Sequence, residues 1–357
     1  MRLNAVLYVS YVNIQCVDLY GTEHFLFYLI MVTLSICSPK SILVTLLVLS
    51  MYALLVITFI YNLHVRGEKP LKTLLTSNEA KLKENFTANA FKGRIIYNRV
   101  GKCGSRFMLA VMSKAAEKNQ FKIVSSSDNG VISSSQRKLT ISQQMKLVAH
   151  ISEIQPPFVF HGHFHFVDFS KYGSTTPIYI NLIRDPIDRF VSAYYFTRFG
   201  DGRNRTWGFK GTKSDKFRTL DECVLSNYSE CTNSNKLLYT IPYFCGQTRG
   251  CRGSSYTSLR RAINNVVNNY LAVGVLEDVN SFIKVLERLL PAFFKEAYME
   301  AVKIGNSSQR MSTITKNKRS LSAKARSVLR RRLHLEYRFY NFVKEKFGKL
   351  KKHLRIT

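Results

Sequence analysis

The sequence predicts an α/β fold: a central parallel sheet flanked by helices, preceded by a transmembrane helix. Short apolar runs rich in β-branched residues alternate with segments of helical periodicity, which is typical of parallel sheets. One of these runs, residues 177–183, is continuously apolar, like a strand buried on both faces. Residues 42–63 form an uncharged, mostly apolar stretch that exceeds the roughly 20 residues needed to cross a bilayer.

Charge restricts the partners of the predicted domain. The chain carries a formal net charge of +30 at pH 7. Acidic and basic side chains balance in residues 1–65, so the excess lies in residues 66–357. A domain this basic is expected to meet a polyanion. Nucleic acid, an anionic membrane surface and a sulfated polysaccharide all satisfy this requirement on charge alone.

The predicted organisation has four parts. Residues 1–41 form a cytoplasmic or extended N-terminal segment, and residues 42–63 form a signal anchor that begins too far along the chain for a cleaved signal peptide. Residues 64–90 are a polar, lysine-rich stem, and residues 91–357 are the folded domain. A second apolar run, residues 25–37, is short for a membrane span, and a hairpin of the two apolar segments is an alternative arrangement.

Cysteines and glycosylation motifs predict an oxidising lumen around this domain. Two closely spaced pairs indicate short disulfide loops, Cys223 with Cys231 and Cys245 with Cys251. A four-cysteine zinc site is the alternative, although spacings of eight and six residues are not those of common zinc knuckles. Four Asn-x-Ser/Thr motifs are candidate glycosylation sites: Asn85, Asn204, Asn227 and Asn306.

A phosphate-binding unit is predicted at residues 94–106, where a strand, a basic loop and a helix start follow one another. Gly101 and Gly104 let the backbone approach a ligand, and Ser105 opens an apolar helical face. The helix N-terminus attracts an anion, and Lys102 and Arg106 add full charges. An ordinary solvated turn is the alternative. The loop is not a Walker loop, because its lysine precedes the second glycine.

The next elements follow the same alternation. Residues 121–125 are a second strand, residues 128–138 a serine-rich surface loop and residues 141–154 a helix that Pro156 and Pro157 end.

Three histidines occupy alternate positions in residues 158–168, which we expect to be extended. His161, His163 and His165 would then share one face. One interpretation is a zinc site of a metal-dependent hydrolase. A second is a general base in a cleft, supported by its neighbours. A third is an exposed edge strand without chemistry.

Arg184 follows the buried strand at residues 177–183. Asp185 and Pro186 supply an N-cap and a first helical residue, so Arg184 lies at a carboxyl strand end beside a helix N-terminus. Open α/β sheets bind ligands at this place. Alternatively, Arg184 pairs with Asp185 or Asp188.

The remaining chain contributes a loop, helices and one further strand. Residues 198–218 are basic and glycine-rich and form a mobile polyanion-gripping loop or a solvated insertion. The pattern then predicts a helix at 259–270, a strand at 271–276, an amphipathic helix at 279–290 and a long helix at 323–350.

Together these segments resemble the uronyl 2-O-sulfotransferase and heparan sulfate 2-O-sulfotransferase family. The resemblance extends over roughly residues 91–348. The loop resembles the branch that acts on dermatan and chondroitin sulfate, whereas His-Gly-His resembles the heparan branch, so both polysaccharide classes stay open. The matching blocks are Tyr97-Asn-Arg-Val-Gly-Lys-Cys-Gly-Ser-Arg106, His161-Gly-His163, Pro177-Ile-Tyr-Ile-Asn-Leu-Ile-Arg-Asp-Pro186, Arg198-Phe-Gly-Asp201, Asp221-Glu-Cys223 and Ile241-Pro-Tyr-Phe-Cys-Gly246.

The resemblance implies a single-pass type II enzyme of the Golgi membrane with a luminal catalytic domain. Its donor would be 3'-phosphoadenosine-5'-phosphosulfate (PAPS), and its product a glycosaminoglycan sulfated at the 2-hydroxyl of hexuronic acid. The resemblance implies no metal and no nucleic acid partner, and it leaves a homo-oligomer open. The rival functions are a zinc-dependent hydrolase and a membrane protein that binds glycosaminoglycans without catalysis.

Residue roles also follow from the resemblance. Lys102 would contact the 5'-phosphosulfate and neutralise charge on the leaving oxygen, and His163 would be the general base. Cys103 is also an implied donor contact of this loop, and it is expected to be a free thiol without catalytic chemistry. The other implied donor contacts are Gly104, Ser105, Arg106, Arg184, Ser192 and Ser312, and the implied sugar contacts are Arg99, His161 and Arg310.

Overall fold

The computed structural model describes residues 50–58, 93–128, 132–133, 137–306 and 314–356. The chain divides into two compact units, residues 1–77 and 78–357. In the first unit the described residues, 50–58, are helical. Across all described residues, no helix combines the length and apolar character that a membrane span requires. Most of the expected span at 42–63 and all of the expected stem at 64–90 lie outside these residues.

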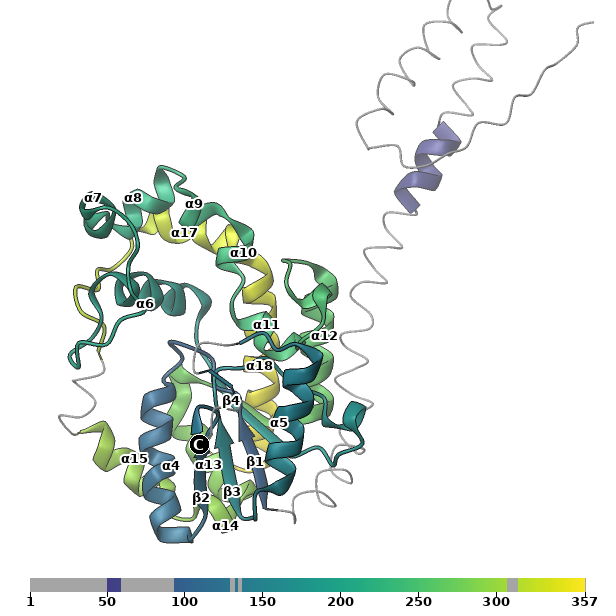
Figure 1. The fold of residues 1–357 in the computed structure, drawn as a ribbon. Coiled ribbons are helices and arrows are strands. Elements are labelled where there is room, and N and C mark those ends of the chain that lie inside the picture. The colour runs from purple at the N-terminus through teal and green to yellow at the C-terminus, as the bar shows by residue number, and fades with distance from the viewer. Residues whose placement is uncertain (1–49, 59–92, 129–131, 134–136, 307–313, 357) are drawn as a thin grey trace, which may run out of the picture. The chain divides into compact units, whose positions relative to one another are not determined.

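The second unit is built on a parallel sheet, as predicted (Figure 1). Its strand order is β2-β3-β1-β4-β5, and every neighbouring pair is parallel. After β1 the chain moves to β2 and returns through β3, and it then crosses to β4 on the other side of β1. This reversal places a ligand-binding crevice at the carboxyl end of β1. The strands are β1 Arg94–Tyr97, β2 Lys122–Ser125, β3 Phe158–His161, β4 Ile178–Ile183 and β5 Tyr270–Val275.

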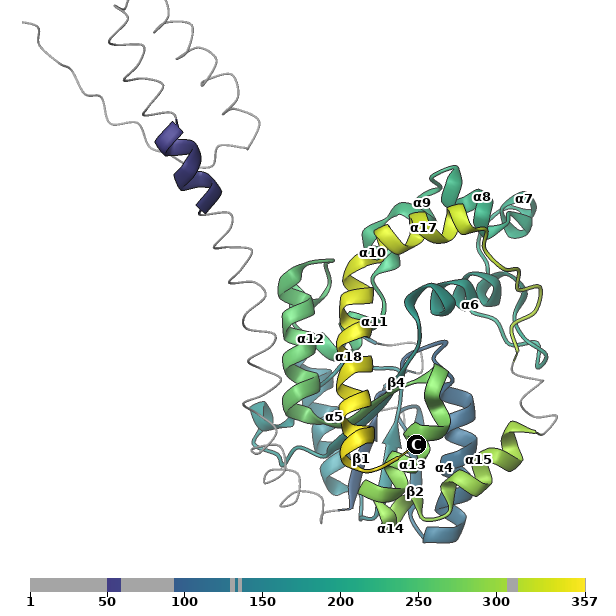
Figure 2. The ribbon, with the colours of Figure 1, turned by 180° about the vertical axis from the view of Figure 1, so that it is seen from behind.

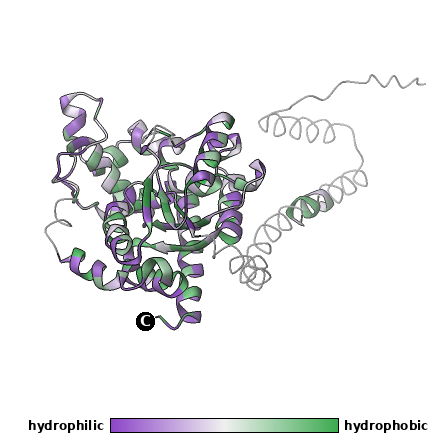
Figure 3. Ribbon diagram, turned by 60° about the horizontal axis from the view of Figure 1, so that its bottom comes forward, coloured by the Kyte–Doolittle hydropathy of each residue, from purple (hydrophilic) through white to green (hydrophobic). Residues whose placement is uncertain are grey.

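Helices cover both faces of the sheet (Figures 1 and 2). The strands themselves are hydrophobic, and polar colour concentrates on the surrounding helices (Figure 3). All six residues of β4 are buried, which explains why its sequence is apolar except for Asn181. One face carries α4 Ser105–Asn119, α13 Val279–Leu289, α14 Pro291–Phe294 and α15 Ala297–Gly305, and the other carries α5 Ile141–Glu153, α12 Tyr256–Asn269 and α18 His334–His353.

A further group of helices arches above the carboxyl end of the sheet (Figure 1). It starts with α6, Pro186–Phe199, whose N-cap Asp185 accepts a hydrogen bond from the Asp188 amide, as the sequence predicted. The short helix α7 lies within the basic stretch 198–218, which is therefore not a simple loop. The other members are α8 Leu220–Leu225, α9 Ser229–Thr232, α10 Ser234–Leu237, α11 Thr240–Cys245 and α17 Ala323–Arg332, with α7 at Lys213–Phe217.

Two predicted elements are shorter than expected. The strand at 158–168 ends at His161, because the amides of His165 and Phe166 bond to the carbonyls of Arg137 and Tyr243 instead of continuing the sheet. The prediction that three histidines share one strand face is therefore wrong.

The prediction of one long helix at 323–350 is also wrong, because this segment forms two helices, α17 and α18, with a break at Leu333. The interruption lets Glu336 of α18 accept the amides of Tyr239, Thr240 and Ile241 at 3.0 Å, which caps the N-terminus of α11.

Candidate active site

The loop between β1 and α4 leaves a helix N-terminus open to a ligand. Gly104 is the N-cap of α4 with a φ of 75°, and no side chain caps the first turn. A Cβ at this position would collide with Leu276, so a glycine is required. Lys102 also adopts a left-handed conformation, with a φ of 65°. The predicted strand, loop and helix are therefore confirmed, and the first amides of α4 are available to an anion.

Lys102 lies at the centre of the loop and contacts two other elements. Its Nζ donates to Thr315 Oγ1 at 3.2 Å and lies 3.6 Å from the centre of the Phe196 ring on α6. Burial, reinforced by the nearby Arg106 and opposed by Asp201, lowers the pKa of Lys102 to about 7. A partly buried ammonium beside other cations favours binding of an anion, since the anion would restore its charge.

Arg106 forms an ion pair with Asp201, a fully buried carboxylate in the loop after α6. Asp201 Oδ1 also accepts the amides of Arg203 and Arg205 at 3.0 and 3.1 Å. Burial alone would raise the pKa of Asp201, but the hydrogen bonds from Arg106 and Arg205 lower it. Asp201 thus ties α4 to the loop after α6, a role that the sequence analysis did not assign.

Arg184 and Ser192 approach the same loop from the next strand. Arg184 donates to the Lys102 carbonyl at 3.5 Å, and Ser192 Oγ lies 3.3 Å from Thr315 Oγ1. Thr315 therefore contacts both Lys102 and Ser192, and it joins the two predicted cationic regions into one. The sequence analysis missed Thr315, because a single threonine in a polar, basic segment has no distinguishing pattern.

The alternative role of Arg184 as a simple ion-pair partner finds no support among the described residues. Asp185 accepts the hydroxyl of Tyr337, and Asp188 lies 3.6 Å from Arg326. The half-buried Arg184 side chain has neither acid as an ion-pair partner in the described parts of the chain. Its charge is therefore available to an anion.

His163 is attached to the loop by a hydrogen bond from its Nδ1 to the carbonyl of Arg99, at 2.8 Å. A carbonyl only accepts, so Nδ1 carries the proton and Nε2 is left with a lone pair. Burial and the charge of Arg99 lower the pKa of His163 to about 3. His163 is therefore neutral at pH 7, and its Nε2 is free to accept a proton.

The other two histidines differ from His163 in their surroundings. Both are buried, and burial lowers the pKa of His161 to about 4 and that of His165 to about 3. The His165 ring packs 5.2 Å from that of Tyr243, whereas His161 ends β3 beside Arg99. Among the described residues, no group of three or more His, Cys, Asp or Glu side chains is arranged to hold a metal ion.

Buried amides fix the strand ends from which these residues emerge. Asn181 Nδ2 donates to the carbonyl and the side-chain oxygen of Asn98, at 2.8 and 2.9 Å. Tyr270 donates to the same side-chain oxygen at 3.0 Å. The network therefore joins β1, β4 and β5 where the binding loops begin. An asparagine inside the apolar run 177–183 was a signal for such a network.

Both predicted disulfides are present, Cys223 with Cys231 and Cys245 with Cys251. Cys103 is a buried free thiol, and burial raises its pKa to about 12. Asn204, Asn227 and Asn306 are exposed. Ser312, Arg310 and Asn85 lie outside the described residues.

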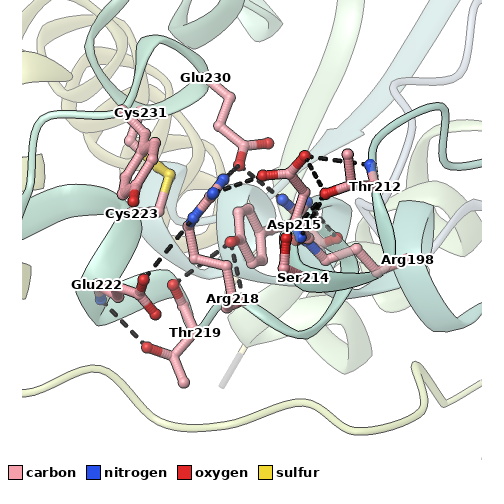
Figure 4. A network of polar contacts seen from close by, with 12 residues as sticks. Arg198, Thr212, Ser214, Asp215, Arg218, Thr219, Glu222, Cys223, Glu230 and Cys231 are labelled. Atoms are coloured by element: carbon pink, nitrogen blue, oxygen red, sulfur yellow. Dashed lines mark hydrogen bonds and ion pairs between the residues drawn. A yellow bond between two sulfur atoms is a disulfide. The ribbon is translucent and has the colours of Figure 1, made fainter.

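Part of the basic stretch 198–218 is neutralised internally (Figure 4). Arg198 pairs with Glu230 at 2.6 Å and lies 3.5 Å from the centre of the Tyr194 ring. Arg218 pairs with Asp215. These two arginines hold α6, α7 and α9 together, so they are not free to grip a polyanion. Four other predicted cations of this stretch are exposed: Arg203, Arg205, Lys210 and Lys213.

Fold and site together define an α/β protein with an uncapped helix N-terminus at the end of β1 and a neutral histidine bonded to the loop that precedes it. The chain belongs to the sulfotransferase family, whose profile matches residues 86–343. Uronyl 2-sulfotransferase of Homo sapiens is 40% identical over 271 residues, which are 73% of this chain and 64% of the relative. The Mus musculus protein is 40% identical over 275 residues, 74% of this chain and 65% of the relative.

A second group of relatives is more distant. Heparan sulfate 2-O-sulfotransferase 1 of Xenopus laevis is 36% identical over 266 residues, which are 72% of each chain. The matched region spans less than two thirds of the two uronyl relatives, 64% and 65% of their lengths. The resemblance found in the sequence is thereby confirmed at the level of the family.

Proposed function

We propose that this protein transfers a sulfuryl group from PAPS to the 2-hydroxyl of a hexuronic acid residue in a glycosaminoglycan. The observation that carries the proposal is the connection of Lys102, Thr315 and Ser192, with Arg184 bonded to the same loop. Two cationic regions at neighbouring strand ends thus meet at one place. The names of the relatives, uronyl 2-sulfotransferase and heparan sulfate 2-O-sulfotransferase, support the reaction and the substrate class.

The residues present fit a nucleotide that carries an anionic group at each end. The positive charges of Arg106 and Arg184 lower the pKa of Lys102, and the carboxylate of Asp201 opposes them. Such a group of cations repels itself until an anion binds. The uncapped first turn of α4 adds backbone donors for a phosphosulfate. Arg184 and the Ser192 hydroxyl suit a phosphate at the other end of the nucleotide.

When bound, PAPS supplies an activated sulfuryl group. His163 takes the proton of the attacking sugar hydroxyl at Nε2, while Nδ1 keeps its proton and its bond to the Arg99 carbonyl. Lys102 stabilises the negative charge that develops on the phosphate oxygen as the S–O bond breaks. Arg99 precedes Lys102 by three residues, so the base and this cation are held by one loop.

The cellular setting belongs to the same proposal. We place the protein in the Golgi membrane as a single-pass type II protein, with the domain at 91–357 in the lumen and a glycosaminoglycan as partner. The apolar stretch 42–63, two disulfides and three exposed candidate glycosylation sites support this placement. The net charge of +30 fits a polyanionic substrate.

The test is incubation of the full-length protein with sulfur-labelled PAPS and defined polysaccharides, followed by disaccharide analysis. We expect label at the 2-position of hexuronic acid in dermatan, chondroitin or heparan chains. Binding of these chains without transfer would overturn the proposal in favour of a non-catalytic binding protein. Label on another position would contradict the assigned acceptor hydroxyl.

A further inference from the structure

The single tryptophan of the chain, Trp207, lies beside the phosphate loop and is half exposed. Its side chain keeps 50% of its accessible surface, although it contacts several rings. At Gly101 of the loop between β1 and α4, a Cβ would lie 2.5 Å from the Tyr239 hydroxyl and 3.4 Å from Trp207 Cζ2. A large aromatic surface is therefore presented to solvent within contact distance of the donor-binding loop.

Neighbouring side chains hold this indole in a fixed orientation. Its ring is nearly parallel to that of Tyr239, with centroids 6.5 Å apart and planes inclined by 24°. On another side it meets the Phe196 ring edge to face at 5.4 Å. The preceding Thr206 anchors the backbone, because its hydroxyl donates to the carbonyls of Phe196 and Thr197 at 3.0 and 2.9 Å. Little orientational freedom is then lost when a ligand packs on the exposed face.

Ring contacts lead from Trp207 both toward His165 and toward Lys102. Its partner Tyr239 packs 5.6 Å from Tyr243, whose ring in turn packs against His165. Arg137 lies 5.2 Å above the Tyr239 ring. By contrast, Arg184 and Ser192 contact the loop through Lys102 and Thr315. Trp207 also packs on Phe196, whose ring centre lies 3.6 Å from Lys102 Nζ, so the indole lies next to the cation assigned to the phosphosulfate end of the donor.

We propose that Trp207 is a stacking platform for a sugar ring of the acceptor polysaccharide, adjacent to the uronic acid that is sulfated. The proposal rests on the proposed function. The C–H face of a pyranose packs on an aromatic plane and needs no buried polar partner. The exposed cation Arg137 beside Tyr239 can pair with a carboxylate or sulfate of the same chain. An open platform also suits a polymer, because the chain extends beyond the site at both ends.

Trp207 reports directly on its own occupancy, because it is the sole tryptophan and its fluorescence has no other source of the same kind. The experiment uses the full-length protein saturated with adenosine 3',5'-bisphosphate and titrated with desulfated dermatan and desulfated heparin tetrasaccharides. We expect a change of emission on adding tetrasaccharide, together with protection from quenching by acrylamide. If the bisphosphate alone gave the whole change and the sugars gave none, Trp207 would instead contact the nucleotide, and the proposal would be overturned.

Kinetics supply an independent readout. Trp207→Ala is expected to raise the KM for the polysaccharide about tenfold and to leave the KM for PAPS unchanged, whereas Trp207→Phe keeps most of the stacking surface and most of the affinity. The control is Tyr256→Ala, an aromatic residue of similar exposure on α12. An unchanged polysaccharide KM in Trp207→Ala would overturn the platform. A wild-type protein that shows the fluorescence change but no transfer would overturn the proposed function while supporting the platform.

Discussion

The Nδ1 atom of His163 donates a hydrogen bond to the carbonyl of Arg99 across 2.8 Å. This bond fixes the tautomer of His163 and attaches it to the loop that presents Lys102. His163, the proposed base, and Lys102, the proposed cation at the leaving oxygen, are therefore connected through one loop, although they follow different strands. A loop displaced by mutation would carry both groups out of position.

Replacing His163 by Ala should abolish sulfuryl transfer. A general base contributes about 10²- to 10⁴-fold, so a loss in kcat of at least hundredfold is expected. Affinity for adenosine 3',5'-bisphosphate should survive, because no donor contact is assigned to this imidazole. Calorimetric titration of the nucleotide and a transfer assay measure the two effects separately. Transfer near the wild-type rate would remove His163 from the role of base.

Donor affinity should fall as the pH rises from 7.5 to 9. The pKa of Lys102 is lowered to about 7, so raising the pH removes the charge that an anion needs. Each unit above the pKa of the free protein costs up to about tenfold in affinity until the pKa of the complex is reached. Titrations of adenosine 3',5'-bisphosphate over this range, where its own phosphates are fully ionised, measure the slope. Lys102→Arg keeps its charge and should give a flat profile; a flat profile in the wild type would contradict the lowered pKa.

His163 should impose no acidic limb on the transfer rate between pH 6 and 8. Its pKa is lowered to about 3 by burial and by Arg99, so it stays neutral throughout this range. Lowering the pH below 7 also keeps Lys102 charged, and kcat should therefore reach a plateau there. The measurement is kcat against pH with PAPS and polysaccharide both saturating, because kcat/KM for PAPS would also reflect the ionisation of its own 3'-phosphate, whose second pKa is about 6. A rate that falls with an apparent pKa near 6.5, the value of an exposed histidine, would show that the imidazole is not shielded.

Arg184→Ala should weaken binding of the donor nucleotide. A charge-assisted hydrogen bond contributes about 1.5–3 kcal/mol, which corresponds to roughly 10- to 150-fold in affinity. Ser192→Ala removes a neutral hydroxyl and should cost less, about 1 kcal/mol. Arg326→Ala on α17 is the matched control, since this arginine pairs with the exposed Asp188. Equal effects of the Arg184 and Arg326 changes would argue for long-range charge rather than a direct contact.

Glu230→Ala should destabilise the domain strongly. Arg198 is only 2% exposed in its side chain, and Glu230 is its ion-pair partner (Figure 4). The Glu230 side chain is 29% exposed, and without it Arg198 keeps only ring and backbone-carbonyl contacts among the described residues, so the loss of this charge-assisted bond is expected to cost about 1.5–3 kcal/mol. Glu222→Ala is the control: its pair with Arg218 spans 3.9 Å at the surface and should contribute about 0–1 kcal/mol. Thermal unfolding of both variants distinguishes them, and similar melting temperatures would contradict the network.

Most of the sheet could be predicted from sequence because its strands are short, apolar and bounded by helix signals. The cap formed by Asp185 and Pro186 marked α6 correctly for the same local reason. The length of the strand at 158–168 was overestimated, since the alternation of polar and apolar residues does not reveal that the His165 and Phe166 amides bond to the distant residues Arg137 and Tyr243. The break at Leu333 likewise depends on a long-range contact, the cap that Glu336 provides to α11.

The site was partly visible in the sequence. Lys102 and Arg184 were found because glycine turns and helix starts place them at strand ends. Thr315 and Asp201 were not found as functional residues, since their importance arises from contacts with residues more than 90 positions away. Trp207 was missed for the same reason. Its position beside Gly101 is set by packing on Tyr239 and Phe196, which no local pattern encodes.

The burial of Cys103 protects the covalent framework of the domain. A thiol with a pKa of about 12 holds almost no thiolate at neutral pH, and the thiolate is the species that attacks a disulfide. The two bonded cysteine pairs therefore coexist with an unpaired sulfur in the same chain without reshuffling. Because this sulfur is buried in the loop between β1 and α4, an alkylating reagent will label it only when that loop opens, so the labelling rate measures the rate of opening.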